Sequence, residues 1–296
     1  MRPVIALNDV TRSFGRKKVL AGVTATAAPG KVVGLLGRNG VGKTTLFKIM
    51  LDMLATDAGE VEVLGMRPDG TGAIRQKVGY VPERPAFHDF MTVGEVFGLR
   101  ARFFKGWRMD KALAMAKQME LPVETSIRGA SKGTLGKTAW VCAAAHDPEL
   151  FLLDEPTSGL DALVREDVLS HMIGELHDSG KSILVANHRM EELSGVLDEI
   201  WVLANGAVHG VHQVETLRTQ ACRITGRLKE GARLPAGMPV AELPAAKPLT
   251  ELIAFEKAVA DMLAASGIFE NIERTPVPLE QTLKFLLKKT NGGSHD

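Results

Sequence analysis

The chain has 296 residues, of which 45% are hydrophobic and 24% are charged, an ordinary composition for a globular protein. Its 36 basic and 35 acidic side chains nearly cancel, which excludes a protein drawn by its overall charge to nucleic acid or to an anionic membrane. Cys142 and Cys222 stand in unrelated contexts without metal-ligand spacing, which favours free thiols in a reducing cytoplasm over disulfides.

No stretch of the sequence reaches the roughly 18 consecutive apolar residues that a membrane helix requires. The start of the chain lacks the apolar segment of a signal peptide, because Asn8, Asp9 and Arg12 interrupt it. If the protein serves transport, we therefore expect a separate multi-span membrane protein to cross the bilayer.

The amino-terminal part of the chain predicts strands followed by a helix. Residues 4–10 and 19–26 alternate loosely and are expected to form strands joined by a polar turn at 12–18. Residues 31–36 form a short apolar run bounded by glycines, which is typical of a buried parallel strand. Helical spacing follows at residues 44–54.

A mostly helical insertion is expected next, because Met, Leu and Ala recur at intervals of three and four residues between 93 and 145. Apolar strands are expected at 150–153 and 182–186, with a helix around 162–178 between them. Strands that alternate with helices predict an α/β fold with a doubly wound parallel sheet and a helical insertion.

The composition changes after residue 212, which predicts an accessory domain of residues 213–296 behind a core domain of residues 1–212. The helical subdomain of the core is expected at about 84–148. We expect the accessory domain to be a small α+β extension.

The accessory segment predicts a connector and two helices. Four prolines between residues 234 and 248 indicate a turn-rich connector. Residues 250–265 predict a helix, because apolar side chains share one helical face. These side chains are Leu252, Phe255, Val259, Met262 and Leu263. A short helix is expected from about residue 278 to 288, followed by a frayed tail at 291–296.

Residues 37–44 read Gly-Arg-Asn-Gly-Val-Gly-Lys-Thr and fit the phosphate-binding pattern G-x-x-x-x-G-K-[ST] at every fixed position. Backbone N–H groups surround a triphosphate only where no side chain obstructs them, and the N-terminus of the following helix favours phosphate. Lys43 would supply charge to the β- and γ-phosphates, and the Thr44 hydroxyl would ligate Mg²⁺. A chance glycine-rich turn is the alternative, but the loop stands between a predicted strand and a predicted helix.

The expected nucleotide-binding residues of this loop are Gly37, Arg38, Asn39, Gly40, Val41, Gly42, Lys43, Thr44 and Thr45.

The apolar run at 150–153 ends in two acids, Asp154 and Glu155. Adjacent strand residues point to opposite faces, so the two carboxylates can have different roles. Asp154 is expected to hold Mg²⁺ through water, and Glu155 to orient and deprotonate the attacking water. Such a pair alone is usually a helix cap or a turn; its combination with the phosphate loop favours catalysis.

Residues 154–161 read Asp-Glu-Pro-Thr-Ser-Gly-Leu-Asp and resemble the joined Walker B motif and D-loop of ABC (ATP-binding cassette) ATPases. The resemblance extends over residues 4 to about 210, with the motifs in the family's order. It implies a P-loop NTPase core, ATP and Mg²⁺ as cofactors, and a head-to-tail dimer. The partner would be a second copy of this chain or a paired ABC ATPase subunit. In that dimer, each ATP lies between the phosphate loop of one subunit and the signature loop of the other.

The resemblance also implies roles for single residues. Phe14 matches the aromatic residue that stacks on adenine; the alternative is a core phenylalanine. Glu83 stands where the Q-loop usually has glutamine, and its carboxylate is expected to bind Mg²⁺ or its water. Asp161 matches the D-loop aspartate of the dimer interface. His188 matches the switch histidine that contacts the γ-phosphate, with a surface or capping histidine as the alternative.

The signature loop departs from the family, because residues 130–134 read Ala-Ser-Lys-Gly-Thr where leucine-serine-glycine-glycine-glutamine is usual. Ser131 and Gly133 remain to face the partner's γ-phosphate. Lys132 either adds positive charge there or points to solvent. Serine-lysine-glycine signatures are similar to those of ABC-2-type exporter ATPases, which predicts an active site; an impaired site in an asymmetric dimer is the alternative.

Three features favour transport. Aromatic and basic residues interleave at 97–108, where transporters of this family receive a coupling helix; the alternative is an amphipathic helix whose aromatics fill the small domain's own core. The chain has one cassette without a coiled-coil arm, and residues 278–286 resemble a closing helix of ABC-2-type exporter ATPases. Nucleic acid is not an expected partner, because the basic patch is short.

The sequence therefore predicts an ATP-hydrolysing subunit that powers a membrane exporter by ATP-dependent dimer closure. It would be cytoplasmic and held at the inner face of the cell membrane by a multi-span permease. A non-transport ABC ATPase that transmits force or a signal to a partner remains an alternative, as does a catalytically inactive interaction module.

Overall fold

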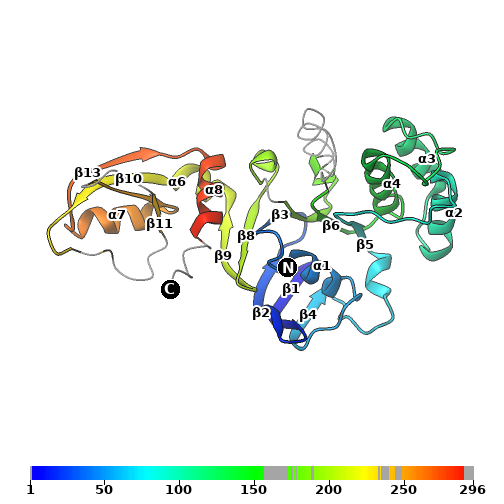
Figure 1. The fold of residues 1–296 in the computed structure, drawn as a ribbon, viewed down its shortest axis with the longest axis horizontal. Coiled ribbons are helices and arrows are strands. Elements are labelled where there is room, and N and C mark those ends of the chain that lie inside the picture. The colour runs from blue at the N-terminus through cyan, green and yellow to red at the C-terminus, as the bar shows by residue number, and fades with distance from the viewer. Residues whose placement is uncertain are drawn as a thin grey trace.

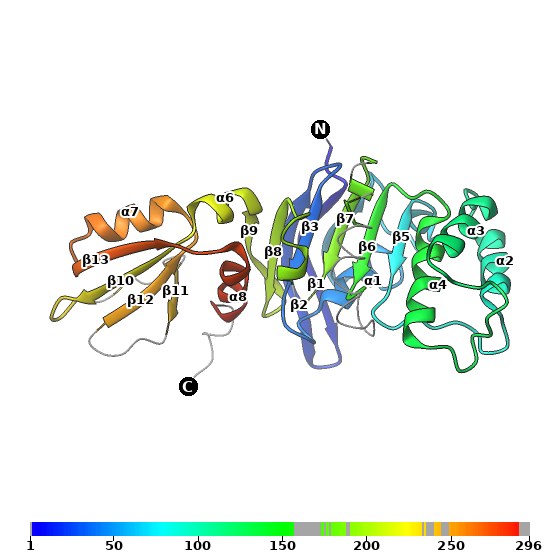
Figure 2. The same cartoon turned by 90° about the horizontal axis from the view of Figure 1, so that it is seen from above.

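The computed structural model describes residues 2–156, 173–174, 176–177, 179–187, 190–232, 234, 240–243 and 249–289. The molecule is elongated, with the helices of residues 93–144 at one end and the C-terminal sheet at the other (Figures 1 and 2). The large central sheet lies between these ends. Across the described ranges, no helix combines the length and the apolar character that crossing a membrane demands.

A six-stranded sheet forms the centre of the core. Its strands, in spatial order, are β5 (Val78–Val81), β6 (Leu150–Asp154), β7 (Ser182–Ala186), β3 (Val32–Leu36), β8 (Glu199–Ala204) and β9 (Ala207–Gln213). The first five run parallel, and β9 pairs antiparallel with β8 at the edge. Every residue of β3, β6 and β7 is buried, as expected for strands covered on both faces. The predicted parallel α/β sheet is confirmed.

A second sheet packs beside the first. It is antiparallel, in the order β2 (Lys17–Ala27), β1 (Ile5–Phe14), β4 (Ala58–Val63). The two predicted strands are longer than expected, because pairing continues to Phe14 and Lys17 and reduces the polar turn to two residues. Helix α1 (Lys43–Met50) shares one hydrophobic cluster with both sheets.

Helix α1 ends earlier than the sequence pattern predicted. The guanidinium of Arg75, in the short 3₁₀ helix η1 (Ala73–Gln76), donates to the carbonyl oxygens of Leu51 at 3.0 Å and Asp52 at 2.8 Å. Asp52 itself adopts a left-handed conformation with φ 55°. These tertiary contacts stop the helix although apolar residues continue to Leu54.

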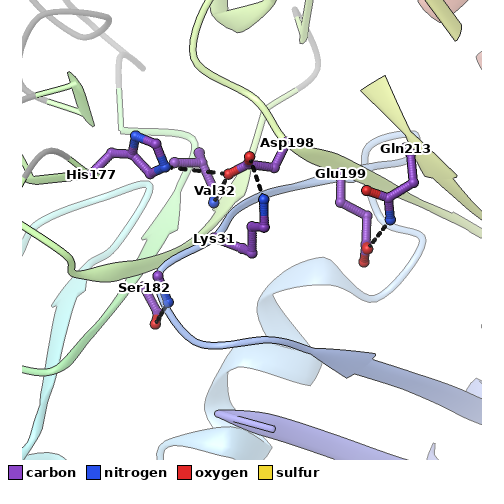
Figure 3. Close-up of polar contacts among 8 residues, drawn as sticks. Lys31, Val32, His177, Ser182, Asp198, Glu199 and Gln213 are labelled. Atoms are coloured by element: carbon purple, nitrogen blue, oxygen red, sulfur yellow. Dashed lines mark hydrogen bonds and ion pairs between the residues drawn. The ribbon is translucent and has the colours of Figure 1, made fainter. Parts of the chain in front are cut away.

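The amino ends of β3 and β8 are joined by one carboxylate, as Figure 3 shows. Asp198 accepts hydrogen bonds from the Val32 N–H at 2.8 Å and from the Lys31 ammonium at 2.9 Å. Nε2 of His177 lies 3.5 Å from the same carboxylate. Asp198 therefore fixes the start of β3 against the start of β8, and with it the direction in which β3 leads toward residue 37.

The predicted helical insertion is confirmed as α2 (Val93–Phe103), α3 (Met109–Gln118) and α4 (Lys132–Ala144). Helix α2 begins at a capping box, in which Thr92 accepts from the N–H of Glu95 and the Glu95 carboxylate accepts from the N–H of Thr92. The three helices surround a hydrophobic cluster of their own.

The C-terminal part is an α+β extension, as predicted. It contains α6 (Val214–Gln220), β10 (Cys222–Leu228), β11 (Val240–Leu243), β12 (Leu249–Ala254), α7 (Lys257–Ala265), β13 (Phe269–Pro276) and α8 (Leu279–Lys289). The four strands form an antiparallel sheet in the order β11-β12-β10-β13. Helix α8 confirms the predicted second helix.

Two predictions for this extension were wrong. The expected connector at 234–248 contains strand β11, and the expected helix at 250–265 is strand β12 followed by α7. Strand β12 is covered on both faces: Leu252 belongs to the cluster under α7, whereas Ile253 belongs to the cluster under α8. A strand buried on both faces has a continuous apolar run, which periodicity alone does not distinguish from a helix.

Two other predictions fall outside the described residues. The helix expected around 162–178 is described only at 173–174 and 176–177, which are helical, and the tail at 291–296 is not described.

Helix α8 joins the extension to the core. Leu283 and Leu286 belong to the same hydrophobic cluster as Met190 and Leu193 of the 3₁₀ helix η2 (Met190–Leu193) and as strand residues of the central sheet. The backbone carbonyl of Ser194 accepts from Arg218 of α6 at 3.0 Å. The extension and the central sheet therefore share a continuous core.

This shared core gives a stability prediction. Leu283 is 1% exposed, so Leu283→Ala leaves a cavity between α8 and the core and is expected to lower the free energy of unfolding by about 2–5 kcal/mol. Gln281→Ala, at an exposed position of the same helix, is the control and should change it little. Urea unfolding measures both; equal, small effects would show that α8 does not pack as described.

Candidate functional site

The phosphate loop connects β3 to α1, and its glycines satisfy different requirements. A side chain at Gly37 would place its Cβ 2.7 Å from the carbonyl oxygen of Leu203, too close for any other residue. Gly40 and Gly42 have φ of 78° and 115°, in the region that glycine adopts without strain. Gly37 and Gly42 are buried, whereas Arg38, Asn39 and Gly40 are exposed. The middle of the loop is therefore accessible from solvent.

Lys43 is the first residue of α1 and is 6% exposed. Its ammonium donates to the carbonyl oxygens of Gly37 at 2.8 Å and Arg38 at 3.3 Å, so the side chain curls back under its own loop. It also lies 3.4 Å from Oε1 of Glu155, which is 8% exposed. The loop and the end of β6 are thus joined by a buried ion pair.

A second contact connects the same two segments. The hydroxyl of Thr44 donates to Oδ2 of Asp154 at 2.6 Å, across 110 positions of sequence. Thr44 stands in the first turn of α1, and Asp154 ends β6. Because β3 and β6 are parallel, their carboxyl ends meet at one edge of the sheet and bring the two motifs together.

The backbone at Glu155 turns sharply away from the strand. Glu155 has φ 48°, a left-handed conformation that is uncommon for a non-glycine residue. Its N–H donates to the carbonyl of Ala186, at the end of β7, at 2.8 Å. The hydrogen bond to β7 holds this conformation and directs the carboxylate to Lys43.

Asp154 lies in an environment that opposes its charge. Burial raises the pKa of its carboxyl, and the negative charges of Glu83 and Glu155 raise it further, while the Thr44 hydrogen bond and Lys43 act in the opposite direction. Burial and the charges of Asp154 and Glu83 also raise the pKa of the Tyr80 phenol. Glu83, on the segment after β5, therefore acts on both groups through its negative charge.

Phe14 lies at the end of β1 and is 50% exposed, which excludes the alternative of a core phenylalanine. The guanidinium carbon of Arg12 lies 5.2 Å from the centre of its ring. The hairpin that carries Phe14 approaches the phosphate loop through Val19, since a Cβ on Gly42 would lie 3.2 Å from Cγ1 of Val19. An exposed aromatic ring on a hairpin that approaches the loop is compatible with base stacking.

The signature loop begins α4. Ser131 is the N-cap residue, and its hydroxyl accepts from the N–H of Thr134 at 3.1 Å. Ser131 and Lys132 are exposed, and Gly133 is half-buried. The segment is therefore available to another molecule, and Lys132 points to solvent in the isolated chain.

Comparison with known proteins places this geometry in a family. A family model described as ABC transporter matches residues 20–158. An ABC transporter ATP-binding protein of Methanocaldococcus jannaschii is 33% identical over 221 residues, which cover 71% of this chain and 78% of that protein. Nod factor export ATP-binding protein I of Rhizobium sp. (strain N33) is 34% identical over 215 residues, 68% of each chain. The chain belongs to the ABC transporter ATP-binding family.

The fold comparison agrees. A solved ATP-binding subunit of an ABC transporter is 26% identical and superposes with a TM-score of 0.65, covering 73% of this chain and 92% of that one. The resemblance found in the motifs is thus confirmed, and the chain is an ABC ATPase.

Two expected site residues of this ABC ATPase, Asp161 and His188, lie outside the described residues. Of the aromatic residues at 97–108, Phe97 is fully buried and Trp107 packs in the same cluster, so the alternative of a core role holds for both. Phe104 lies 4.4 Å, centroid to centroid, from the buried His146. Of the aromatic residues Phe97, Phe103, Phe104 and Trp107, only Phe103 is largely exposed, at 66%.

The sequence interpretation overlooked Tyr80, Arg12 and Asp57. Tyr80 lies on β5, which pairs with β6 in the sheet, and burial together with the charge of Asp154 raises the pKa of its phenol. Arg12 and Asp57 are 45 residues apart, and only the pairing of β1 with β4 brings them together. No local pattern reveals such a contact.

The raised pKa of Asp154 predicts how this carboxylate affects stability. Because burial disfavours its charged form, Asp154 costs stability at pH values above its folded pKa, and the cost fades as pH falls toward the unfolded value of about 3.9. Nucleotide-free Asp154→Asn is therefore expected to be more stable than the wild type at pH 8, on the order of 1 kcal/mol. The difference should shrink at pH 4, close to the unfolded value.

Urea unfolding without nucleotide or metal measures this difference. Asp89→Asn, at an exposed position, is the control and should be neutral at both pH values. An Asp154→Asn variant less stable than the wild type at pH 8 would contradict the charge environment described.

Proposed function

We propose that this ABC ATPase binds and hydrolyses MgATP and that ATP-dependent closure of a dimer powers a separate membrane exporter. The observation that carries the proposal is the joining of the phosphate loop to the two acids. Thr44 contacts Asp154 at 2.6 Å, and Lys43 contacts Glu155 at 3.4 Å. These contacts gather a phosphate-binding cation, a metal-ligating hydroxyl and two carboxylates at one edge of the sheet.

The hydrogen-bond partners of the Lys43 ammonium can be replaced by the phosphate oxygens of ATP. Its ammonium bonds two loop carbonyls and one carboxylate inside the site. The β- and γ-phosphates of ATP bring several negative charges to the same place, and charge-assisted hydrogen bonds to them are stronger than those to neutral carbonyls. Lys43 would exchange the loop carbonyls for the phosphates, while the N–H groups of residues 40–45 bind the remaining oxygens.

Thr44 and Asp154 suit Mg²⁺. Hydroxyl and carboxylate oxygens are the ligands that Mg²⁺ prefers, and Oδ1 of Asp154 is buried without a hydrogen-bond partner among the described residues. The negative charge of Glu83 acts on Asp154 and raises the pKa of its carboxyl, and Glu83 would hold the metal or its water. The ion would supply charge neutralisation at the β- and γ-phosphates.

Glu155 would act as the general base. Its carboxylate is buried beside Lys43, and movement of Lys43 toward the phosphates would leave Glu155 able to orient the attacking water and accept its proton. Its backbone is tied to the end of β7 through Ala186. His188, two residues beyond that strand, would contact the γ-phosphate.

The second half of the site would come from a partner subunit. Ser131 is exposed and Gly133 half-buried at the start of α4, where both would face a partner's γ-phosphate, and Asp161 would cross the interface. We propose a homodimer or a pair with another ABC ATPase subunit, with residues 1–212 as the ATPase domain and 213–296 as an accessory domain. We propose no nucleic-acid partner for this ATPase.

Export is supported by the relatives. The 34% identical protein of Rhizobium is named for Nod factor export, and the serine-lysine-glycine signature resembles that of ABC-2-type exporter ATPases. A multi-span permease would hold the ATPase at the cytoplasmic face of the membrane and contact it through the helical subdomain, where Phe103 is exposed. Copurification with the native membrane subunit tests this part directly.

The role of Glu155 gives the functional prediction. Glu155→Gln keeps the size and hydrogen-bonding capacity of the side chain but removes its basicity, so ATP turnover is expected to fall by about 10²–10⁴-fold. ATP binding should persist, and the variant should accumulate as an ATP-bound dimer. Steady-state phosphate release and size-exclusion chromatography with MgATP measure the two effects.

Glu149→Gln is the matched control, because Glu149 is exposed and precedes the same strand β6. It should hydrolyse ATP at the wild-type rate. Equal turnover of wild type and Glu155→Gln would remove Glu155 from the role of base.

A further inference from the structure

The exposed ring of Phe14 is supported by an ion pair that belongs to none of the nucleotide-binding motifs. The carboxylate of Asp57 accepts from Nη1 of Arg12 at 2.9 Å and from the N–H of Ser13 at 2.6 Å. The N–H of Asp57 donates to the carbonyl of Thr11 at 2.9 Å. Asp57 therefore makes three contacts with the last residues of β1 and fixes both their backbone and the Arg12 side chain.

Arg12 in turn covers one side of Phe14. The two residues are separated by one position on a strand, so their side chains lie on the same face. The guanidinium carbon lies 5.2 Å from the ring centre, within the range of a cation–π contact. The Arg12 side chain is 24% exposed, whereas Phe14 is 50% exposed. One side of the ring is thus taken, and the ring still presents a large apolar surface to solvent.

The position of Asp57 relates the Phe14 ring, with Arg12 on one side of it, to the phosphate loop. Asp57 directly precedes β4 and follows the segment that leaves helix α1, and α1 begins at Lys43. On the other strand of the hairpin, Val19 would contact a Cβ on Gly42. The hairpin that carries the ring therefore lies against the phosphate loop at Val19.

We propose that the Arg12–Asp57 pair positions Phe14 for the nucleotide base and so determines the affinity for the purine part of ATP. This rests on the proposed function, because it requires ATP in the site. Arg12 is a positioning residue: it acts through the ring, whereas the base would stack on Phe14. An aromatic platform held in one orientation loses less freedom when a base stacks on it.

The test separates the base from the phosphates. Arg12→Met keeps the aliphatic stem and removes the cation, and we expect the KM for ATP to rise roughly three- to tenfold with kcat nearly unchanged. Binding of inorganic tripolyphosphate, which has no base, should be unaffected. Arg12→Lys keeps a cation and should restore part of the affinity for ATP.

Two controls sharpen the result. Arg67→Met removes an arginine that pairs with Glu60 of the same sheet, at 3.3 Å, and should leave every parameter unchanged. In a Phe14→Ala background, Arg12→Met should have no further effect on the KM for ATP, because the ring through which it acts is gone.

The outcomes are distinct. Wild type that fails to bind ATP would overturn the proposed function, and this inference with it. If the wild type binds ATP and Arg12→Met binds it with the same affinity, the inference is overturned but the proposed function is not. Loss of tripolyphosphate affinity in Arg12→Met, or a full effect of that substitution in the Phe14→Ala background, would also overturn it.

Discussion

The site depends on a buried ion pair between Lys43 and Glu155, at 3.4 Å, beside the hydrogen bond from Thr44 to Asp154. Burying an isolated pair of opposite charges rarely adds stability, because both ions lose their water. Here the cation has three partners in the site, and the neighbouring Asp154 is held in an environment that raises its pKa. The arrangement is costly in the empty protein and suited to a ligand that brings phosphate charges and a divalent ion.

The surrounding fold fixes the two segments that make this contact. Asp198 anchors the start of β3, so the strand delivers Gly37 to a place where only glycine fits beneath Leu203. The hydrogen bond from Glu155 to the end of β7 holds the left-handed turn that aims its carboxylate. The helical insertion and the C-terminal extension lie at opposite ends of the molecule (Figure 2).

How far the sequence predicted these features depends on whether they are local. The phosphate loop, the strand that leads to the two acids and the helical insertion are encoded in short runs, and each was located correctly. The helix expected over 250–265 failed because β12 packs against two clusters, which gives a strand the apolar run of a helix. The left-handed backbone of Glu155 and the Arg12–Asp57 pair arise from tertiary contacts, which no window of sequence contains.

The central claim is that Lys43 exchanges its partners in the protein for phosphates. Calorimetric titration with MgATP tests it most directly, in a Glu155→Gln background so that removing the ammonium leaves no buried carboxylate unpaired. There, Lys43→Met is expected to weaken ATP binding at least about tenfold, or 1.4 kcal/mol. Lys48→Met, at an exposed position of α1, should bind like its parent. Equal affinity of the Lys43→Met variant and its parent, with both folded, would contradict the account.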